Sequence, residues 1–286
     1  MFKHFGIVGA GTMGSGIAQA AALSGVDVIL YDINDTVLRQ ALERVKQDFR
    51  KGVNRGKLTQ EQTTEAFARI HPRTKLSDLK HCELVVEAII EDLMVKKDLF
   101  RHLETDTKPS TILATNTSSL SVTAIASVLR HPERAVGLHF FNPAHIMKLV
   151  EVIKGQQTSP EVVQQTVEFA KQIGKTPVVA KDTPGFIVNR VARPFYGEAL
   201  RLLGENVASV EQIDRIVKDG AGFPMGPFEL MDLIGIDVNF AVTQSMYEQY
   251  FGEPRYRPHP IQKRMVEAGQ IGRKSGQGFY KYEETK

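Results

Sequence analysis

The sequence predicts an α/β domain built on a mostly parallel sheet, followed by a second domain made only of helices. In residues 1–183, short apolar runs alternate with stretches of helical periodicity, a pattern typical of parallel strands joined by crossover helices. Beyond that point only helical periodicity remains. Residues 181–185 contain Pro and Gly and indicate a linker between the two patterns. We therefore expect one domain at residues 1–183 and an all-helical domain at residues 184–286.

Composition excludes several classes of protein. The chain has 286 residues, 42% hydrophobic and 24% charged, with a net charge of only +3, so composition gives no case for a nucleic-acid or membrane partner. No apolar run approaches the roughly 18 residues of a membrane span, and the first residues lack the order of a signal peptide. Cys82 is the only cysteine, so no intrachain disulfide can form, and no zinc-type ligand spacing occurs. We expect a cytoplasmic protein without a metal.

The first strand, at residues 5–8, leads into a glycine-rich turn and then a helix of small residues to about position 24. The turn consists of Gly9, Ala10, Gly11, Thr12, Met13 and Gly14. A second strand follows at residues 26–31 and ends at Asp32. This order of strand, G-x-G-x-x-G turn, helix, strand and acid is typical of a Rossmann-type dinucleotide site. An ordinary tight turn between strand and helix is the simpler interpretation, but such a turn would not require an acid such as Asp32 at the end of the second strand.

Each part of this motif has a physical role. Gly9 allows the tight turn, Gly11 lets a diphosphate approach the backbone, and Gly14 lets the helix pack closely on the strand. The helix N-terminus offers N–H groups and a positive dipole end to the diphosphate. Asp32 can accept hydrogen bonds from both ribose hydroxyls and would repel a 2′-phosphate. The motif therefore predicts NAD rather than NADP.

Residues 34–68 interrupt the alternation of strands and helices. Asn34 is placed to cap one helix, and Thr59 with Gln62 forms a capping-box pattern for a second. We expect a helical hairpin inserted in the first domain. Its tip carries four bases and no acid, namely Arg50, Lys51, Arg55 and Lys57. A solvated charged surface is the simpler interpretation, and a grip on an anionic ligand tail is the functional one.

The remaining strands of the first domain end in polar residues. We predict strands at residues 84–88, 111–114, 134–141, 149–153 and 177–180. Glu91 and Lys96 follow the first of these, and Asn116 and Ser118 lie in a polar loop after the second. Because ligands bind at the carboxyl edge of an open α/β sheet, these side chains are candidates for cofactor or substrate contacts.

His139 lies near the end of its predicted strand, and Glu151 lies twelve residues later on the next. A chain that turns near Asn142 and Pro143 and comes back would bring the carboxylate to the imidazole. A carboxylate on one ring nitrogen fixes the tautomer and makes the other nitrogen a proton acceptor. A hydrogen-bonded structural histidine is the plainer alternative on spacing alone.

These motifs together resemble the NAD-dependent L-3-hydroxyacyl-CoA dehydrogenases, in particular the bacterial 3-hydroxybutyryl-CoA type. The resemblance rests on GAGTMG at 9–14, NTSS at 116–119, GLHFFNP at 137–143, KLVEV at 148–152, DTPGFIVNR at 182–190, GPFELMD at 226–232 and GRKSGQGFY at 272–280. It covers essentially the whole chain. The sequence shows no hydratase-like region, so we expect the stand-alone kind of enzyme rather than the fused multifunctional kind.

The resemblance implies a role for each matching residue. His139 would be the catalytic acid and base, Glu151 its partner, and Ser118 and Asn189 would hold the reacting oxygen at substrate C3. The glycine-rich turn from Gly9 to Gly14 and Asp32 would bind NAD. Near the ribose and nicotinamide of NAD would lie Glu91, Lys96, Asn116 and Ser118. Asn142 would support the loop after His139 and is also assigned to the cofactor site. His145 follows that loop and receives no role; we expect it to face outward.

The resemblance also implies an acyl-CoA substrate, with a short chain such as 3-hydroxybutyryl-CoA favoured, and a place in fatty-acid or butanoate metabolism. The hairpin would grip CoA, and the helical domain would form a substrate wall and the interface of a homodimer. Two alternatives remain open. One is a related sugar-acid dehydrogenase of the L-gulonate type, which needs no CoA. The other is a non-catalytic NAD-binding structural protein.

Overall fold

A computed structural model describes residues 1–282 and divides the chain into two compact units, Met1–Thr183 and a second that starts at Pro184. The first unit is an α/β domain and the second is helical, so the predicted fold class is confirmed. Among the described residues, no helix is long and apolar enough to cross a membrane.

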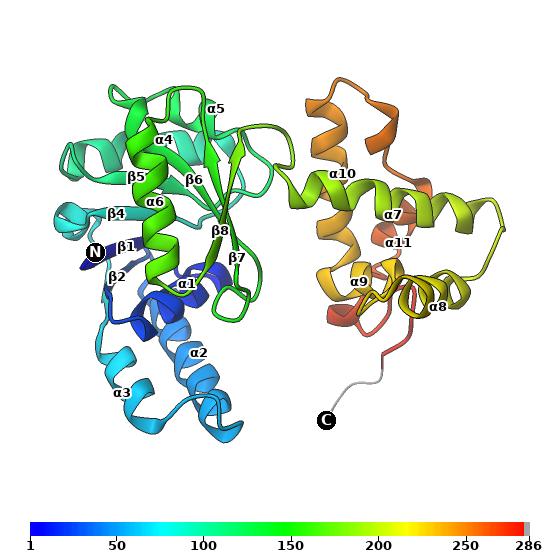
Figure 1. Ribbon diagram of the computed structural model, residues 1–286, viewed down its shortest axis with the longest axis horizontal. Helices are drawn as coiled ribbons and strands as arrows, with labels where there is room; N and C mark the ends of the chain where they lie inside the picture. Colours follow the sequence, from blue (N-terminus) through cyan, green and yellow to red (C-terminus); the bar gives the residue numbers. More distant parts are fainter. Residues whose placement is uncertain (283–286) are drawn as a thin grey trace. The chain divides into compact units, whose positions relative to one another are not determined.

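An eight-stranded sheet forms the centre of the first unit (Figure 1). In chain order the strands are β1 His4–Val8, β2 Asp27–Tyr31, β3 Ile70–Arg73, β4 Leu84–Glu87, β5 Ile112–Thr115, β6 Ala135–Phe140, β7 Leu149–Lys154 and β8 Thr176–Lys181. Their order in the sheet is β3-β2-β1-β4-β5-β6-β7-β8. All neighbours pair in parallel except β6 and β7, which are antiparallel. The carboxyl ends of β1 to β6 therefore share one edge of the sheet.

Helices cover both faces of this sheet (Figure 1). They are α1 Thr12–Leu23, α2 Asp35–Asn54, α3 Gln60–Ala68, α4 Leu93–Asp106, α5 Val122–Ala126 and α6 Pro160–Gln172. One core, which includes Phe5 and Ile7 of β1, packs against α1, α2 and α6. The other, which includes Val8, packs against α4 and α5. Successive residues of β1 thus enter opposite cores, as a strand buried on both faces requires.

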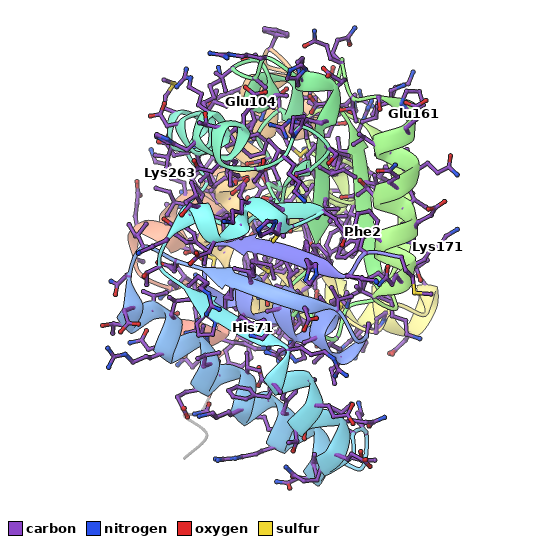
Figure 2. The ribbon with its side chains drawn as sticks, turned by 90° about the vertical axis from the view of Figure 1, so that its left-hand side faces the viewer. Phe2, His71, Glu104, Glu161, Lys171 and Lys263 are labelled. Carbon is purple, nitrogen blue, oxygen red and sulfur yellow. The ribbon has the colours of Figure 1, made fainter. Side chains whose placement is uncertain are left out.

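Helix α6 also fixes the start of the chain. The backbone N–H of Phe2 donates to Gln172 Oε1 at 2.9 Å, and Gln172 Nε2 donates back to the Phe2 carbonyl oxygen at 2.8 Å. The Phe2 ring meets Phe169 edge-on with centroids 5.3 Å apart. Figure 2 shows Phe2 beside this helix, close to Lys171. These contacts hold the chain immediately before β1 against α6.

The inserted hairpin is formed by α2 and α3, and its caps agree with the sequence pattern. The Asn34 side chain accepts from the N–H of Thr36 at 2.9 Å. Thr59 and Gln62 form the reciprocal capping box, with distances of 3.1 and 2.9 Å. The four bases of the tip are exposed. The capping residues thus determine where each helix of the hairpin begins.

The second unit is a bundle of helices. They are α7 Val188–Gly204, α8 Val210–Ala221, α9 Pro227–Ile234, α10 Ile236–Gln249 and α11 Pro260–Glu267. Two buried aspartates stabilise it: Asp214 accepts from the N–H groups of Phe228 and Glu229 at the start of α9, and Asp232 accepts from the N–H of Phe279 at 3.0 Å. These two motif regions therefore act within the bundle, as anchors for a helix start and for the C-terminal segment.

Candidate active site

The glycine-rich turn leaves the N-terminus of α1 open to a ligand. Gly9 has a φ of +99°, a conformation that favours glycine. A Cβ on Gly14 would overlap the carbonyl oxygen of Gly9, whereas the position of a Cβ on Gly11 meets no atom within 4 Å. Gly11 is the N-cap of α1, so no side chain there bonds the first N–H groups of the helix. Open backbone N–H groups and the helix dipole are what a diphosphate needs.

A cavity of about 680 Å³ lies beside this turn. Asp32 is on its wall, just beyond β2. Its Oδ2 accepts from the N–H of Ala10 at 2.9 Å and its Oδ1 from the N–H of Asn34 at 3.0 Å, which fixes the carboxylate between the turn and the start of α2. The other walls are mostly apolar, formed by Val8, Tyr31, Ile33, Val37, Ala88, Ile89, Ile90, Val95 and Leu99. An apolar slot with one oriented carboxylate suits an adenine ring and its ribose.

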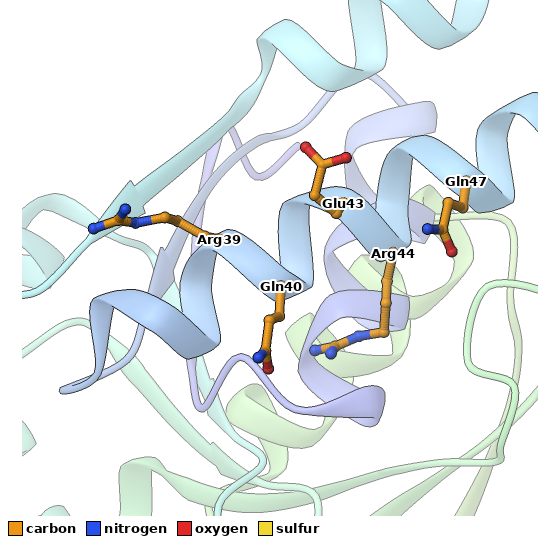
Figure 3. Close-up of a pocket in the computed structure, with 5 residues that line it drawn as sticks. All are labelled: Arg39, Gln40, Glu43, Arg44 and Gln47. Atoms are coloured by element: carbon orange, nitrogen blue, oxygen red, sulfur yellow. The ribbon is translucent and has the colours of Figure 1, made fainter.

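Helix α2 also contacts the glycine-rich turn. Arg44 Nη2 donates to the carbonyl oxygen of Ala10 at 2.7 Å. A smaller hollow of about 420 Å³ is lined by Arg39, Gln40, Glu43, Arg44 and Gln47 of this helix (Figure 3). In Figure 3, Gln40 and Arg44 point to the same side of α2. The hairpin thus bonds to the backbone of the turn as well as packing beside it. The sequence pattern did not reveal this contact, because 34 residues separate the partners.

A buried group of charges lies at the ends of β4 and β5. Lys96 Nζ is 2.8 Å from both carboxylate oxygens of Glu87 and 3.2 Å from Glu91 Oε2. The side chains of Lys96 and Glu87 are 1% and 0% exposed, and Thr115 donates its hydroxyl to Glu87. Sequence reasoning selected Lys96 and Glu91 but missed Glu87. Its signal was an acid inside an apolar strand run, because fully buried acids are rare unless paired.

Glu91 holds the loop that carries Ser118. Its Oε1 accepts from Thr117 Oγ1 at 2.5 Å, from the N–H of Ser118 at 3.0 Å and from the N–H and hydroxyl of Ser119 at 3.2 and 3.1 Å. Burial by itself would raise the pKa of Glu91, but Lys96 and these donors more than offset it and lower the pKa. Glu91 is therefore a charged anchor for the loop.

The same loop is tied to the strand of the candidate histidine. Asn116 Oδ1 accepts from the backbone N–H of Phe140 at 2.8 Å. Phe140 follows His139 directly in β6, so this bond sets the loop beside the end of that strand. Since the amide oxygen of Asn116 faces β6, its amide nitrogen is the end turned the other way. The structure thus joins Glu91, Asn116 and Ser118 to the end of β6 that carries His139.

His139 and Glu151 form a buried pair. They lie opposite each other in the antiparallel register of β6 and β7, and His139 Nδ1 is 2.8 Å from Glu151 Oε2. Their side chains are 7% and 1% exposed. The Phe141 ring packs on the imidazole with centroids 4.5 Å apart. A carboxylate only accepts hydrogen bonds, so Nδ1 carries the proton and Nε2 presents its lone pair. The pair thus has the geometry of a general base with a fixed tautomer.

The segment after β6 differs in one respect from expectation. Asn142 is exposed and its bond to Pro143 is cis. His145 was expected to face outward but is half-buried, and burial lowers its pKa. The loop is held by Lys175 Nζ, which donates to the carbonyl oxygens of Ala144 and Met147 at 2.6 and 2.9 Å. His145 is thus less exposed than expected, and Lys175 holds the same loop from a position distant in the sequence.

Asn189 belongs to the second unit, at the start of α7. Its Oδ1 accepts from Arg193 Nη2 at 3.4 Å, one turn further along the helix. Asn189 is half-buried. In residues 1–282 no group of three or more His, Cys, Asp or Glu side chains is arranged to hold a metal ion. Within the first unit, the polar chemistry of the candidate site comes from the His139–Glu151 pair, the Ser118 loop and the glycine-rich turn.

An NAD-binding α/β unit with a buried His–Glu pair defines a class of nicotinamide-dependent dehydrogenase, and comparison with known proteins identifies the family. Residues 4–183 match the model of the 3-hydroxyacyl-CoA dehydrogenase NAD-binding domain, and residues 185–282 match that of the 3-hydroxyacyl-CoA dehydrogenase C-terminal domain. The chain belongs to the 3-hydroxyacyl-CoA dehydrogenase family, and its cofactor is NAD. The predicted family resemblance is thereby confirmed.

Individual relatives are similar over nearly all of this chain. A 3-hydroxyadipyl-CoA dehydrogenase of Escherichia coli K12 is 51% identical and matches 96% of this chain, which covers 58% of that relative. A probable 3-hydroxybutyryl-CoA dehydrogenase of Deinococcus radiodurans is 46% identical, with 97% and 99% covered. A crystal structure of 3-hydroxybutyryl-CoA dehydrogenase from Escherichia coli K12 superposes with a TM-score of 0.96 at 50% identity, covering 99% of this chain and 60% of that one. The chain thus spans little more than half the length of the Escherichia coli relatives and nearly all of the Deinococcus one.

Proposed function

We propose that the protein oxidises the C3 hydroxyl of an (S)-3-hydroxyacyl-CoA to a ketone with NAD, and catalyses the reverse reduction. The observation that carries the proposal is the buried His139–Glu151 pair at 2.8 Å, at the edge of the sheet where the NAD-binding turn also lies. A structural NAD-binding protein would not need such a pair beside the Ser118 loop. Family membership supports acyl-CoA as the substrate class.

In this proposal His139 moves the proton. Its Nδ1–H is engaged by Glu151, so Nε2 takes the proton of the C3 hydroxyl during oxidation and returns it during reduction. Glu151 stabilises the imidazolium that forms, because the charge is buried beside it. Ser118 and Asn189 donate hydrogen bonds to the oxygen as it becomes a carbonyl. NAD, when bound, supplies the acceptor for the hydride that leaves C3.

The proposed cofactor site uses the first unit alone. The turn from Gly9 through Ala10, Gly11, Thr12 and Met13 to Gly14 would bind the diphosphate, and Asp32 would bind the adenosine ribose. Glu91, Asn116, Ser118 and Asn142 would lie toward the nicotinamide end. Lys96 contributes through Glu91, because its own ammonium is buried between two carboxylates. The open N-terminus of α1 and the apolar cavity with its single carboxylate fit the two ends of an adenosine diphosphate.

The proposed CoA grip uses the hairpin of residues 34–68. Its exposed basic tip supports this role, because the phosphates of CoA are anionic. A short acyl chain such as 3-hydroxybutyryl remains the favoured substrate. A chain that ends in a carboxylate is the second candidate, since the 51% identical relative is named for 3-hydroxyadipyl-CoA. The L-gulonate type of sugar-acid dehydrogenase has no such support.

A substrate panel tests the activity. NADH loss would be followed with acetoacetyl-CoA, with 3-oxoadipyl-CoA and with a longer 3-ketoacyl-CoA, while NADPH with acetoacetyl-CoA and NAD with L-gulonate run in parallel. We expect turnover with NADH and a 3-ketoacyl-CoA, and the best substrate defines the acyl class. Oxidation of L-gulonate without activity on any acyl-CoA would establish the alternative, and inactivity on all substrates would contradict an enzymatic function.

We also propose a homodimer formed through the helical unit, in a reducing, cytoplasmic compartment. Several apolar side chains of this unit are exposed and would be covered by a second copy: Ile187, Val191, Ile216, Leu233, Ile234 and Val238. The single, buried Cys82 supports a reducing compartment. Light scattering after size exclusion should give a mass near twice the 31.8 kDa of the chain. A monomer at micromolar concentration would contradict the dimer.

A further inference from the structure

Arg193 is a buried cation inside the helical unit, and no acid among residues 1–282 forms an ion pair with it. Its side chain extends from α7, and the residue is 4% exposed. Its Nη1 donates to the carbonyl oxygen of Asn239 at 2.9 Å and to Thr243 Oγ1 at 3.2 Å, and the guanidinium lies 4.9 Å from the Tyr196 ring centroid. Within residues 1–282 none of the ion pairs includes it. Burial lowers its pKa to about 10, so it still carries its charge at neutral pH.

Packing of the bundle does not account for this arginine. The Asn239 carbonyl oxygen also accepts from Thr243 Oγ1 at 2.8 Å, so it keeps a partner without Arg193. In the described part of the chain, the Nε of Arg193 is buried without a hydrogen-bond partner. Burying a cation is costly unless an opposite charge pairs with it and hydrogen bonds satisfy it. The presence of a guanidinium here therefore points to a role other than stability.

The remaining contact of Arg193 is with Asn189. Nη2 of the arginine donates to Asn189 Oδ1 across one helical turn, at 3.4 Å. A guanidinium has donors and no acceptor, whereas an asparagine amide has one end of each kind. Only the oxygen end of Asn189 can therefore face Arg193 favourably. The contact favours the orientation in which the amide oxygen of Asn189 faces the arginine and its NH₂ group is turned away from it.

We propose that Arg193 is a positioning residue that keeps the amide of Asn189 oriented as a hydrogen-bond donor. The inference rests on the proposed function, in which Asn189 donates to the oxygen at C3 of the substrate. An amide turned the other way would present its own oxygen to the substrate oxygen, and two acceptors would face each other. Arg193 prevents that orientation without touching the substrate.

A double-mutant cycle tests the inference. The variants are Arg193→Met, Asn189→Ala and both together, and kcat and KM are measured with NADH and the best 3-ketoacyl-CoA of the panel. Loss of one donor to a developing charge lowers kcat by roughly a hundredfold or more, so a partly misoriented amide should cost about tenfold. Once Asn189 is absent, Arg193→Met should lower kcat by less than about twofold further. Its KM for NADH should stay unchanged in both backgrounds.

Matched variants separate positioning from packing. Arg201→Met removes another arginine of α7, one that is paired with Glu198 at 2.8 Å, and should leave kcat unchanged. Arg193→Lys retains a donor without an acceptor and should keep more activity than Arg193→Met. Thermal unfolding should show Arg193→Met to be folded; if it is not, Arg193→Gln takes its place in the cycle.

The outcomes distinguish the two claims. If the wild type reduces a 3-ketoacyl-CoA and the two substitutions multiply their effects, Arg193 acts independently of Asn189 and the inference is overturned, while the proposed function stands. If the wild type reduces none of the 3-ketoacyl-CoA substrates, the proposed function fails and the inference fails with it. If kcat of Arg193→Met equals that of the wild type, Asn189 needs no positioning and the inference is likewise overturned.

Discussion

Glu151→Gln changes one property of the His139 pair and keeps the rest. Glutamine has nearly the shape of glutamate, and its amide oxygen can still accept from Nδ1 of His139 at the observed 2.8 Å. The tautomer with the lone pair on Nε2 is therefore retained. What is lost is the negative charge beside the imidazole, which matters only when His139 is protonated during the reaction. The substitution thus isolates the electrostatic contribution of Glu151.

The structure sets the size of the effect. Both side chains are almost completely buried, so solvent screens the pair little. A hydrogen bond to a charged group contributes about 1.5–3 kcal/mol, against about 1 kcal/mol for a neutral one. Two unit charges about 4 Å apart at an effective dielectric constant near 20 interact by about 4 kcal/mol, which is an upper bound. The difference between the two kinds of hydrogen bond, about 0.5–2 kcal/mol, and the upper bound of about 4 kcal/mol bracket the loss, so kcat should fall by between about twofold and about 1000-fold.

The assay is steady-state loss of NADH with saturating 3-ketoacyl-CoA, together with fluorescence titration of NADH. Glu133→Gln is the matched control, because Glu133 pairs with His131 at 3.1 Å on the surface, where both side chains are more than half exposed. We expect kcat to fall only for Glu151→Gln and NADH affinity to change in neither variant. A kcat within twofold of the wild type for Glu151→Gln would refute the stabilising role of the carboxylate.

Three further predictions concern the first unit. Asp32→Ala should weaken NADH binding and narrow the preference over NADPH, and an unchanged ratio of the two dissociation constants would count against the ribose contact. Glu91→Gln should lower kcat more than tenfold by loosening the Ser118 loop. Glu91 should also stabilise the folded protein, because its pKa is lower in the folded than in the unfolded state. This contribution to the free energy of unfolding is fully present above pH 4.5 and is lost as pH falls through the folded pKa. Urea unfolding of the wild type and of Glu91→Gln from pH 7 to 3 measures the difference in their free energies of unfolding. A difference that grows as the pH falls would contradict this prediction. Burial raises the pKa of Cys82 from 9.0 to about 12, so a thiol reagent at pH 8 should react roughly a thousandfold more slowly than with a model thiol, and rapid labelling of native protein would contradict this.

Some of the candidate site follows directly from local sequence. The glycine-rich turn was predictable because the first strand, the turn, the helix and the second strand follow one another directly in the chain. The meeting of His139 and Glu151 was predictable because a chain that turns after the first strand, near Asn142 and Pro143, brings the next apolar run back beside it. In the structure the antiparallel register places the two residues opposite each other. The capping residues of the hairpin, Asn34 and Thr59, were likewise readable because a cap acts within a few residues.

Other parts depend on contacts between distant residues. Glu87 of β4 accepts hydrogen bonds from Lys96 of α4 and Thr115 of β5. These three elements come together only in the folded domain. Arg44 of α2 contacts the glycine-rich turn, and Lys175, which immediately precedes β8, contacts the loop that contains His145. Among the described residues, the side chains of Arg44 and Lys175 bond only to groups far away in the sequence, so no neighbouring residue indicates their contacts. Long flexible side chains choose partners in space, so their targets could not be read from spacing.

Substitution of His139 by alanine tests the central claim most directly. The measurement is kcat for NADH-dependent reduction of acetoacetyl-CoA, or of the better 3-ketoacyl-CoA, with the NADH dissociation constant determined on the same sample. General acid–base catalysis contributes roughly a hundred- to ten-thousandfold, so kcat should fall at least a hundredfold in His139→Ala while NADH binds as it does to the wild type. A variant that binds NADH and retains near wild-type turnover would show that the buried His139–Glu151 pair is structural, and the proposed mechanism would be wrong.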